Sequence, residues 1–343
     1  MWQVTGQDRD LALLDRSLKE SSIAHAYILV GPRHVGKRTL ALNLAQALNC
    51  EGFEPPCGQC RSCRRILEGK HADVIPIGLD SKTEISIDDV REARRLANLP
   101  PYEGKCKVFI IDDAEYLSNE ASNALLKVLE EPPPKVVWLL LACDEGRLLP
   151  TVVSRCHRLA LRPMPAKQIE RILVDSYGIP LDRARLLARL GRGCLGWALS
   201  ALANDNLLEQ RFQRTDTLTS LLDAGLQRRF AYAQELAREF SQDRRTVAEV
   251  MSLWLGLWQD FMLTKCSRRE AITNIDYVET IEAISRQLTL AEIKDFIANL
   301  YSAIEDISKN ANALLTLELL MLSMPRKGTV DGQGSRSSFQ ARR

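Results

Sequence analysis

A phosphate-binding pattern near the N-terminus constrains the fold more than any other feature. The segment GPRHVGKRT (31–39) meets the spacing G-x-x-x-x-G-K through Gly31, Gly36 and Lys37. It follows the apolar run AHAYILVG and opens KRTLALNLAQALNC, whose apolar residues have helical spacing. Strand, glycine turn and helix are the context that this pattern requires, because backbone N–H groups at the helix N-terminus then cradle phosphates. The segment therefore predicts a nucleotide-binding loop in which Lys37 reaches the phosphates.

The residue after the lysine departs from the pattern. A Ser or Thr normally stands there and holds Mg²⁺ through its hydroxyl, whereas this chain has Arg38, and Thr39 comes one residue late. One residue along a helix turns the side chain by roughly 100°, so Thr39 cannot simply replace the missing hydroxyl. The loop is therefore expected to bind ATP or ADP and to hydrolyse the nucleotide poorly. Mg²⁺ is expected with the nucleotide only if the remaining ligands still hold the metal.

Two acids follow a second apolar run, CKVFIIDDAEYL. Asp112 is in position to hold Mg²⁺ through water, and Asp113 stands where a residue normally positions the attacking water. The arm of an aspartate is shorter than that of a glutamate, so Asp113 is expected to be a poor catalytic base. Both acids also fit the ordinary role of polar residues at the end of a buried strand.

The first half of the chain alternates strand-like and helix-like segments. A third apolar run, KVVWLLLACDE (135–145), follows the helical pattern SNEASNALLKVLEE, which Pro132 stops. Such alternation predicts a mainly parallel sheet with helices on both faces. Beyond Pro163 and Pro165 the strand signal fades and helical patterns take over. The predicted divisions are an α/β P-loop domain at 1–160, a small helical domain at 161–207, an all-α domain at 208–325 and a disordered tail at 326–343.

Composition places the chain among ordinary globular proteins. Apolar residues make up 45% and charged residues 26% of its 343 residues, and the net charge is +2. No global field therefore draws it to nucleic acid or membranes. No apolar run is long enough to span a bilayer, and the N-terminus lacks the apolar core of a signal peptide. We expect a cytoplasmic protein with no membrane partner, and an apolar helix at 310–325 buried against its neighbours.

Four of the nine cysteines form a cluster, Cys50, Cys57, Cys60 and Cys63, with the spacing C-x6-C-x2-C-x2-C. Thiolates two residues apart converge on one ion across a tight turn, and four of them form a closed tetrahedral site that is structural rather than catalytic. An iron–sulfur cluster also accepts four thiolates. The pattern predicts a metal knuckle at 50–63. His71 is interpreted as a surface histidine, and the remaining five cysteines are interpreted as small core residues: Cys106, Cys143, Cys156, Cys194 and Cys266.

Several motifs together resemble one family. The phosphate loop, the cysteine knuckle, KVFIIDDAEYLSNEASNALLKVLEEPP and LLPTVVSRC occur in the order found in bacterial DNA polymerase III clamp-loader subunits, which are AAA+ proteins. The resemblance covers residues 1 to about 205. It implies an AAA+ P-loop domain, then a small helical lid and an all-α C-terminal collar domain. It also favours Zn²⁺ in the knuckle.

The resemblance distinguishes a gamma/tau motor from its non-motor relative, delta-prime. The motor has Thr after the loop lysine, an Asp-Glu pair on the second strand and an arginine in the second domain that contacts the γ-phosphate. This chain has Arg38, Asp113 and Gly196 at those positions. Three losses in one pocket point to the delta-prime type, with weak or absent ATPase activity of its own.

One functional motif of the family is retained in the segment Ser154-Arg155-Cys156. In the family this motif projects its arginine into the ATP site of the neighbouring subunit. Arg155 is therefore expected to act as an arginine finger in trans, although a surface cation beside Arg158 is the plainer interpretation. Such a finger accelerates phosphoryl transfer by about 10³–10⁵.

The resemblance also implies partners: gamma/tau and delta subunits in a hetero-pentameric ring, the sliding clamp, and primer–template DNA. Two alternatives remain at this point. One is a working gamma/tau-type motor. The other is a zinc-dependent nucleic-acid-binding AAA+ protein without motor function, suggested by the basic residues around the knuckle: Arg61, Arg64, Arg65 and Lys70. No acidic pair that we could assign to nucleotidyl transfer is visible, so any polymerase activity would belong to the holoenzyme.

Overall fold

The computed structural model describes residues 2–79, 84–309 and 311–326. They form two compact units, one up to Leu207 and one from Leu208 onward. The tail predicted to be disordered lies outside the described residues apart from residue 326. Among the residues described, no helix is both long and apolar enough to cross a membrane.

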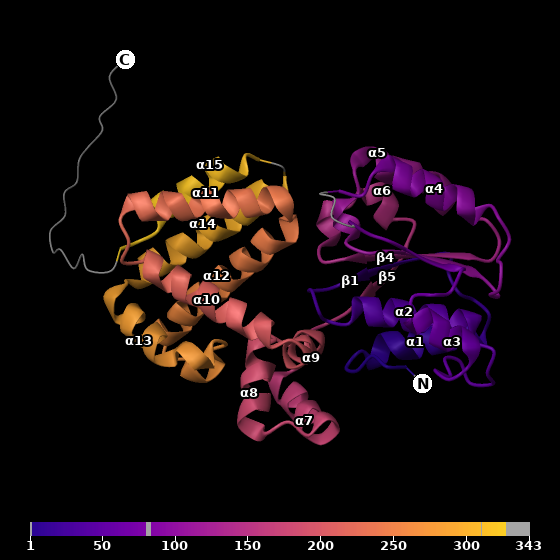
Figure 1. Cartoon of the computed structure of the whole chain (residues 1–343), viewed down its shortest axis with the longest axis horizontal. Helices are drawn as coiled ribbons and strands as arrows, with labels where there is room; N and C mark the ends of the chain where they lie inside the picture. Colours follow the sequence, from indigo (N-terminus) through magenta and orange to yellow (C-terminus); the bar gives the residue numbers. More distant parts are fainter. Residues whose placement is uncertain (1, 80–83, 310, 327–343) are drawn as a thin grey trace, which may run out of the picture. The chain divides into compact units, whose positions relative to one another are not determined.

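A five-stranded sheet forms the centre of the first unit (Figure 1), in the order β2-β3-β4-β1-β5. All neighbouring strands run parallel. The strands are β1 (Ala26–Val30), β2 (Val74–Ile77), β3 (Lys107–Ile111), β4 (Val136–Ala142) and β5 (His157–Ala160). Every residue of β3 and β4 is buried, as a parallel sheet covered on both faces requires.

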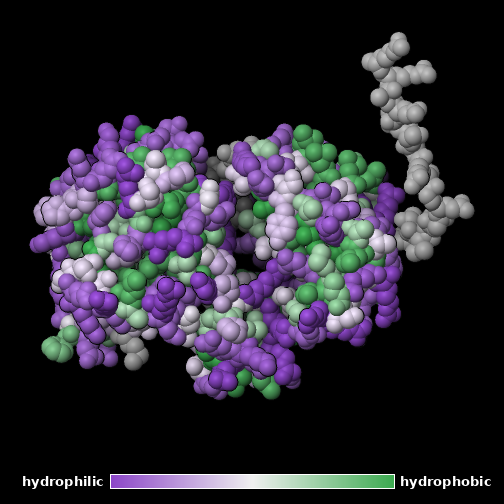
Figure 2. Space-filling model, turned by 180° about the vertical axis from the view of Figure 1, so that it is seen from behind, coloured by the Kyte–Doolittle hydropathy of each residue, from purple (hydrophilic) through white to green (hydrophobic). Residues whose placement is uncertain are grey.

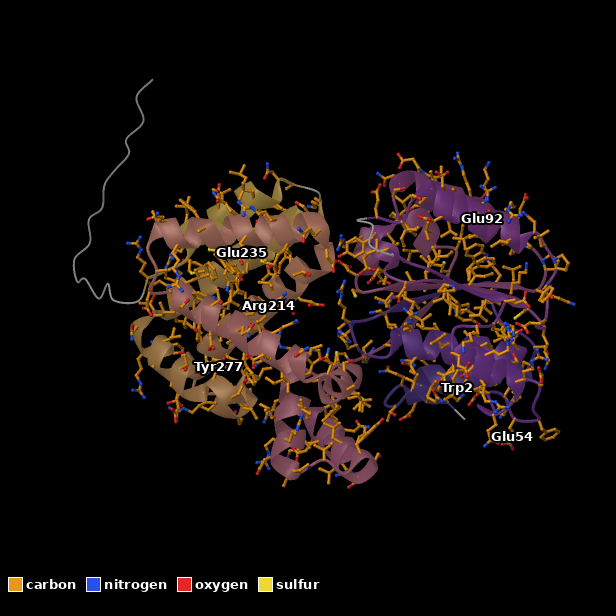
Figure 3. The ribbon with its side chains drawn as sticks, in the orientation of Figure 1. Trp2, Glu54, Glu92, Arg214, Glu235 and Tyr277 are labelled. Atoms are coloured by element: carbon orange, nitrogen blue, oxygen red, sulfur yellow. The ribbon has the colours of Figure 1, made fainter. Side chains whose placement is uncertain are left out.

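Helices cover both faces of this sheet (Figure 1). One face carries α1 (Asp8–Lys19), α2 (Lys37–Asn49) and α3 (Arg61–Leu67), and the other carries α4 (Ile87–Ala97), α5 (Asn119–Glu130) and α6 (Pro150–Val153). On the second of these faces Phe109 stacks on Trp138, with ring centroids 4.3 Å apart. Trp2, labelled in Figure 3, donates its indole N–H to Asp15 at 2.7 Å and so ties the N-terminal segment to α1.

Local sequence signals set the ends of these helices. Ser86 and Asp89 form a reciprocal capping box at the start of α4. The Ser118 hydroxyl accepts the N–H of Ala121 at the start of α5. Two short 3₁₀ turns follow β3 and β4: η1 (Ala114–Tyr116) and η2 (Glu145–Arg147). Loops and these short turns therefore follow the strands at the carboxyl edge of the sheet.

Three helices complete the first unit: α7 (Ala166–Tyr177), α8 (Leu181–Leu190) and α9 (Leu195–Ala203). Pro165 and Pro180 stand directly before α7 and α8, where a fixed φ favours helix initiation. Gly178 ends α7 with φ 66°, a left-handed conformation that glycine adopts without strain.

The second unit is helical throughout its described residues. It contains α10 (Asp205–Leu221) from Leu208 onward, and then α11 (Leu226–Gln242), α12 (Arg244–Lys265), the turns η3 (Arg269–Ala271) and η4 (Ile275–Tyr277), α13 (Val278–Gln287), α14 (Leu290–Ser308) and α15 (Ala313–Ser323). Its core centres on aromatic residues, and Trp258 packs on Phe296 with ring centroids 4.2 Å apart.

A buried arginine joins the helix ends of this unit. Arg229 of α11 is 1% exposed, and its guanidinium donates to backbone carbonyl groups at the ends of α10 and α15. The acceptors are the carbonyls of Leu221, Leu222, Met321, Met324 and Pro325. A cation at a helix C-terminus interacts favourably with the unpaired carbonyls there, which compensates for burial of the charge.

Helix α15, which lies within the predicted apolar segment 310–325, is buried on one side only. Leu317, Leu320 and Met321 of α15 lie in the core, whereas its outer leucines are 37–57% exposed. These are Leu314, Leu315, Leu319 and Leu322. Figure 2 shows hydrophobic side chains, coloured green, on the face of this unit that is turned toward the viewer. The expectation of a helix buried against its neighbours is therefore right for one face of α15 and wrong for the other.

The sequence missed two strands, β2 and β5, and both are edge strands of the sheet. Edge strands are less buried than central ones, so they need fewer apolar residues and leave a weaker signal. Two residues of β5, His157 and Arg158, are exposed, and β2 contains Pro76, which an edge strand tolerates. The interpretation of His71 as a surface residue was wrong, because it is 4% exposed and hydrogen-bonded to the Ser62 hydroxyl at 3.1 Å.

Candidate functional site

The predicted phosphate loop connects β1 to α2 at the carboxyl edge of the sheet. The N–H of Gly31 donates to the carbonyl of Ala142 at the end of β4, at 3.2 Å. A Cβ on Gly31 would lie 2.6 Å from the carbonyl oxygen of Leu161, so only glycine fits there. Gly36 stands at the N-cap of α2 with φ 108°, and His34 also has a positive φ, 61°. The first N–H groups of α2 are thereby presented at the end of the loop, as an anion site requires.

The Lys37 side chain folds back beneath this loop. Its ammonium group donates to the carbonyls of Gly31 at 2.6 Å and Pro32 at 3.0 Å. It also lies 3.5 Å from the sulfur of Cys143. An ammonium group has three donors, so carbonyl groups of the loop occupy at least two that a phosphate would use.

The two acids after β3 are paired with arginines of the loop and α2. Arg38 donates from Nη1 to Oδ2 of Asp112 at 2.9 Å. Arg33 lies 3.7 Å from Asp113, measured from Nη2 to Oδ1. Thr39 is exposed on α2. The structure therefore brings Asp112 and Arg38 together, with a guanidinium at the position where the motif normally supplies a hydroxyl.

Sequence reasoning missed two polar groups near the Lys37 ammonium group, Cys143 and Glu115. Cys143 directly follows β4, and its backbone N–H donates to the Glu115 carboxylate at 3.2 Å. Glu115 is 8% exposed. Burial and the neighbouring Glu115 carboxylate raise the pKa of the Cys143 thiol. The position of Cys143 at the carboxyl end of a buried strand is the signal that could have identified it.

The expectation for the other single cysteines was partly wrong. Cys106 and Cys194 are buried, whereas Cys156, like Cys143, is only half-buried. Cys266 is exposed, so its interpretation as a core residue was wrong.

Gly196 lies directly against the phosphate loop. Its N–H donates to the carbonyl of His34 at 3.1 Å, and a Cβ at this position would lie 2.6 Å from the same oxygen. Helix α9 thus begins on the loop itself, and the absence of a side chain at Gly196 allows this contact. The small helical region is joined to the loop through a backbone hydrogen bond.

Arg155 lies in the turn after α6 and is held at the surface. Its Nη2 atom is 2.7 Å from Oε1 of Glu130, the last residue of α5, and Nη1 donates to the carbonyl of Thr151 at 3.0 Å. The side chain is 36% exposed. The guanidinium is therefore oriented by its own unit and remains accessible to solvent.

The four predicted metal ligands converge. The sulfur atoms of Cys50, Cys57, Cys60 and Cys63 all lie within 4.8 Å of one another, and those of Cys57 and Cys63 are 3.9 Å apart. A tetrahedral zinc site with Zn–S bonds of about 2.3 Å places its sulfurs about 3.8 Å apart. The four side chains therefore fit a structural Zn²⁺ ion.

Backbone N–H groups donate to at least three of these sulfurs. The N–H of Cys57 donates to the sulfur of Cys50, that of Cys60 to Cys57 and that of Cys63 to Cys60, at 3.3–3.4 Å. N–H groups of Cys60 and Gln59 lower the pKa of the Cys57 thiol to about 6. Such donors stabilise the thiolate form, which is the form that binds metal. Glu54 marks this loop in Figure 3.

The anchoring of the knuckle explains its position on the first unit. Lys105 donates its ammonium group to the backbone carbonyl of Cys50. The Asn49 side-chain oxygen accepts the N–H groups of Lys105 and Cys106, at 2.8 and 3.0 Å. The end of α2 and the segment before β3 therefore hold the first cysteine in place.

A phosphate loop between β1 and α2, two acids after β3 and the strand order β5-β1-β4-β3-β2 together define the AAA+ class of P-loop domains. Residues 6–165 match the family model described as DNA polymerase III, delta subunit. The chain is similar to bacterial DNA polymerase III clamp-loader subunits, and its similarity to the delta-prime type extends over most of its length.

Two relatives illustrate this placement. The chain is 29% identical to DNA polymerase III subunit delta' of Bacillus subtilis over 322 residues, covering 93% of this chain and 96% of that protein. It is 40% identical to DNA polymerase III subunit tau of Escherichia coli over 204 residues, which are 57% of this chain and 31% of that protein. This chain therefore spans only about a third of the tau relatives it matches.

Among solved structures, a DNA polymerase III gamma subunit-related protein from Thermotoga maritima is 19% identical, with a TM-score of 0.43. The alignment covers 91% of this chain and 97% of that one.

Proposed function

We propose that this chain supports ATP-driven loading of a sliding clamp onto primed DNA during replication, as the delta-prime-type subunit of a clamp loader. In this role it lends Arg155 to the ATP site of a neighbouring motor subunit and hydrolyses little ATP itself. Its partners are gamma/tau and delta subunits in a hetero-pentameric ring, the clamp and primer–template DNA. Zn²⁺ holds the knuckle together, and the phosphate loop binds ATP or ADP.

The observation that carries this proposal is the contrast between two arginines. Arg38 stands in the chain's own pocket and pairs with Asp112, where a motor has a metal-binding hydroxyl. Arg155 is accessible at the surface and is oriented by Glu130. A guanidinium held outward in this way is suited to stabilise charge on a phosphoryl group that another subunit binds.

The pocket also gives reasons to disfavour a working motor. Asp113 is paired with Arg33 rather than left to position water, and Gly196 has no side chain to reach a γ-phosphate. The zinc-dependent nucleic-acid-binding alternative has less support, because Arg65 lies 3.2 Å from Glu103 and Lys70 lies 2.9 Å from Glu68. Two of its four basic residues are thus engaged with acids.

The test is an ATPase assay on a ring reconstituted with a gamma-type motor. Arg155→Ala is expected to lower turnover at the ATP site that receives Arg155 by about 10³-fold or more, the effect of losing an arginine finger. Lys37→Ala is expected to leave ring turnover largely intact, because this chain's own pocket contributes little hydrolysis.

Arg158→Ala is the matched control, since Arg158 is a neighbouring surface arginine paired with an acid, Glu145. Equal activity of rings carrying Arg155→Ala and Arg158→Ala would rule out the finger. Brisk ATP turnover by the isolated chain, abolished by Lys37→Ala, would rule out the non-motor role.

A further inference from the structure

The residues of this pocket do not fit the Mg²⁺ ion that usually accompanies a P-loop nucleotide. Mg²⁺ requires six oxygen ligands, and in this kind of site the protein's share comes from the hydroxyl after the lysine and from the strand-end acid, while waters and phosphate oxygens supply the rest. Here Arg38 replaces the hydroxyl, and a guanidinium has five donors and no acceptor. Its Nη1 atom already lies 2.9 Å from Oδ2 of Asp112. The carboxylate that would hold the metal is thus paired with a cation belonging to the chain.

We propose that Arg38 takes the place of Mg²⁺ as the counter-charge in this pocket, so that the chain binds a nucleoside di- or triphosphate without a divalent cation. This inference rests on the proposed binding of nucleotide at the phosphate loop. A guanidinium suits the task because its planar fork matches two phosphate oxygens at once. The Arg38 side chain is 65% exposed, so its remaining donors are open to a ligand.

The surrounding contacts agree with a fixed cation at this point. Asp112 is held in place, since its backbone N–H donates to the carbonyl of Ile77 at 2.8 Å, and so it steers the arginine. Lys37, the preceding residue of α2, donates its ammonium group to the Gly31 carbonyl of the loop. Two positive charges at the start of one helix, together with the helix N-terminus, offset part of the charge of a diphosphate. A guanidinium can neutralise phosphate charge, but it cannot activate a bound water or polarise a phosphoryl oxygen as a metal ion does. The chain therefore binds the nucleotide without the metal chemistry that hydrolysis uses.

The experiment measures the affinity of the full chain for a fluorescent ADP analogue, with ATP as competitor, in buffer with and without Mg²⁺. The metal-free buffer is prepared over a chelating resin and contains no added chelator, so the cysteine knuckle keeps its metal. The variants are Arg38→Thr, which restores the hydroxyl, and Arg38→Thr combined with Asp112→Asn. Arg16→Thr is the control, because Arg16 also forms an exposed pair with an acid, Glu20, at 2.8 Å.

The unaltered chain and Arg16→Thr are expected to bind with affinities that Mg²⁺ changes by less than about threefold, below the usual range of coupling between two ligands. Arg38→Thr should bind about 5–150-fold more tightly with Mg²⁺ than without it, which is that usual range. The double variant should lose this gain, since the acid ligand is gone.

Two results would overturn the inference. One is a requirement for Mg²⁺ in the unaltered chain, and the other is no nucleotide binding by the unaltered chain in either buffer. Both results are measured on the unaltered chain, so the inference can be refuted even if Arg38→Thr does not fold. Neither result touches the role of Arg155, which the ring ATPase assay tests separately.

Discussion

The contact between Gly196 and His34 can be tested by adding a single methyl group. In Gly196→Ala the new Cβ would lie 2.6 Å from the His34 carbonyl oxygen, against 3.4 Å or more for an ordinary contact. The neighbour is backbone, so the start of α9 and the phosphate loop must separate by about 0.8 Å to relieve the overlap. A shift of that size applied to the 3.1 Å bond from the Gly196 N–H takes it beyond hydrogen-bond range.

Three contributions set the expected change in the free energy of unfolding. The lost hydrogen bond costs about 1 kcal/mol. Residual strain from overpacking costs about 1–3 kcal/mol. Alanine is favoured over glycine inside a helix by about 1 kcal/mol, which offsets part of the loss. The net expectation is a destabilisation of about 1–3 kcal/mol, or roughly 2–12 °C in unfolding temperature for a unit of this size.

The assay is thermal unfolding of Gly196→Ala beside Gly78→Ala. A Cβ on Gly78 meets no atom within 4 Å, so this control carries the same substitution without the overlap. Hydrogen exchange at the start of α9 should also speed up in Gly196→Ala only. Equal unfolding temperatures and equal exchange in the two variants would refute the argued contact.

Two further predictions concern the first unit. Cys60→Ser should lower the zinc content of the chain, measured by elemental analysis, and destabilise the unit by about 3 kcal/mol or more. Cys266→Ser should do neither, and an unchanged zinc content in Cys60→Ser would contradict the proposed site. Burial tends to raise the pKa of Asp73, but the N–H groups of Tyr102, Glu103 and Gly104 outweigh it and hold this pKa below its ordinary value of 3.8. Its stabilisation is therefore full above pH 3.8 and is lost as the pH falls through the lower folded-state pKa. Asp73→Asn should cost about 2–4 kcal/mol near neutral pH, and the difference from the unaltered chain, measured by denaturant titration, should shrink below about pH 4; a gap that is constant with pH would exclude this account.

The central part of the fold could be predicted from the sequence because its signals are strong and local. The apolar runs that became β1, β3 and β4 are buried on both faces, and the glycine spacing fixes a loop between β1 and α2. The acids after β3 then had to reach the same edge, because parallel strands end together. The edge strands escaped detection because exposure removes the need for apolar residues.

The contacts within the site could not be predicted in the same way. Arg38 and Asp112 are 74 residues apart, and nothing in their spacing says that one side chain would reach the other. The hydrogen bond between Gly196 and His34 likewise depends on how α9 packs on the loop. Sequence spacing fixes where strands and helices end, whereas side-chain pairing depends on rotamers and packing that only coordinates define.

The free energies of the Arg38 and Lys37 contacts indicate whether these contacts keep a nucleotide out of the pocket. Arg38 and Asp112 form a pair that is open to solvent, and such pairs contribute about 0–1 kcal/mol, so Arg38 can shift its donors from Asp112 to a phosphate at little cost. The Lys37 ammonium gives up two carbonyl partners to reach a phosphate, and each net hydrogen bond is worth about 1 kcal/mol, which new charge-assisted bonds recover. Neither pairing closes the pocket to a nucleotide. The missing hydroxyl after Lys37 is different, because no rearrangement of the chain supplies it. Under the proposed function, the pocket therefore keeps a nucleotide and hydrolyses it poorly.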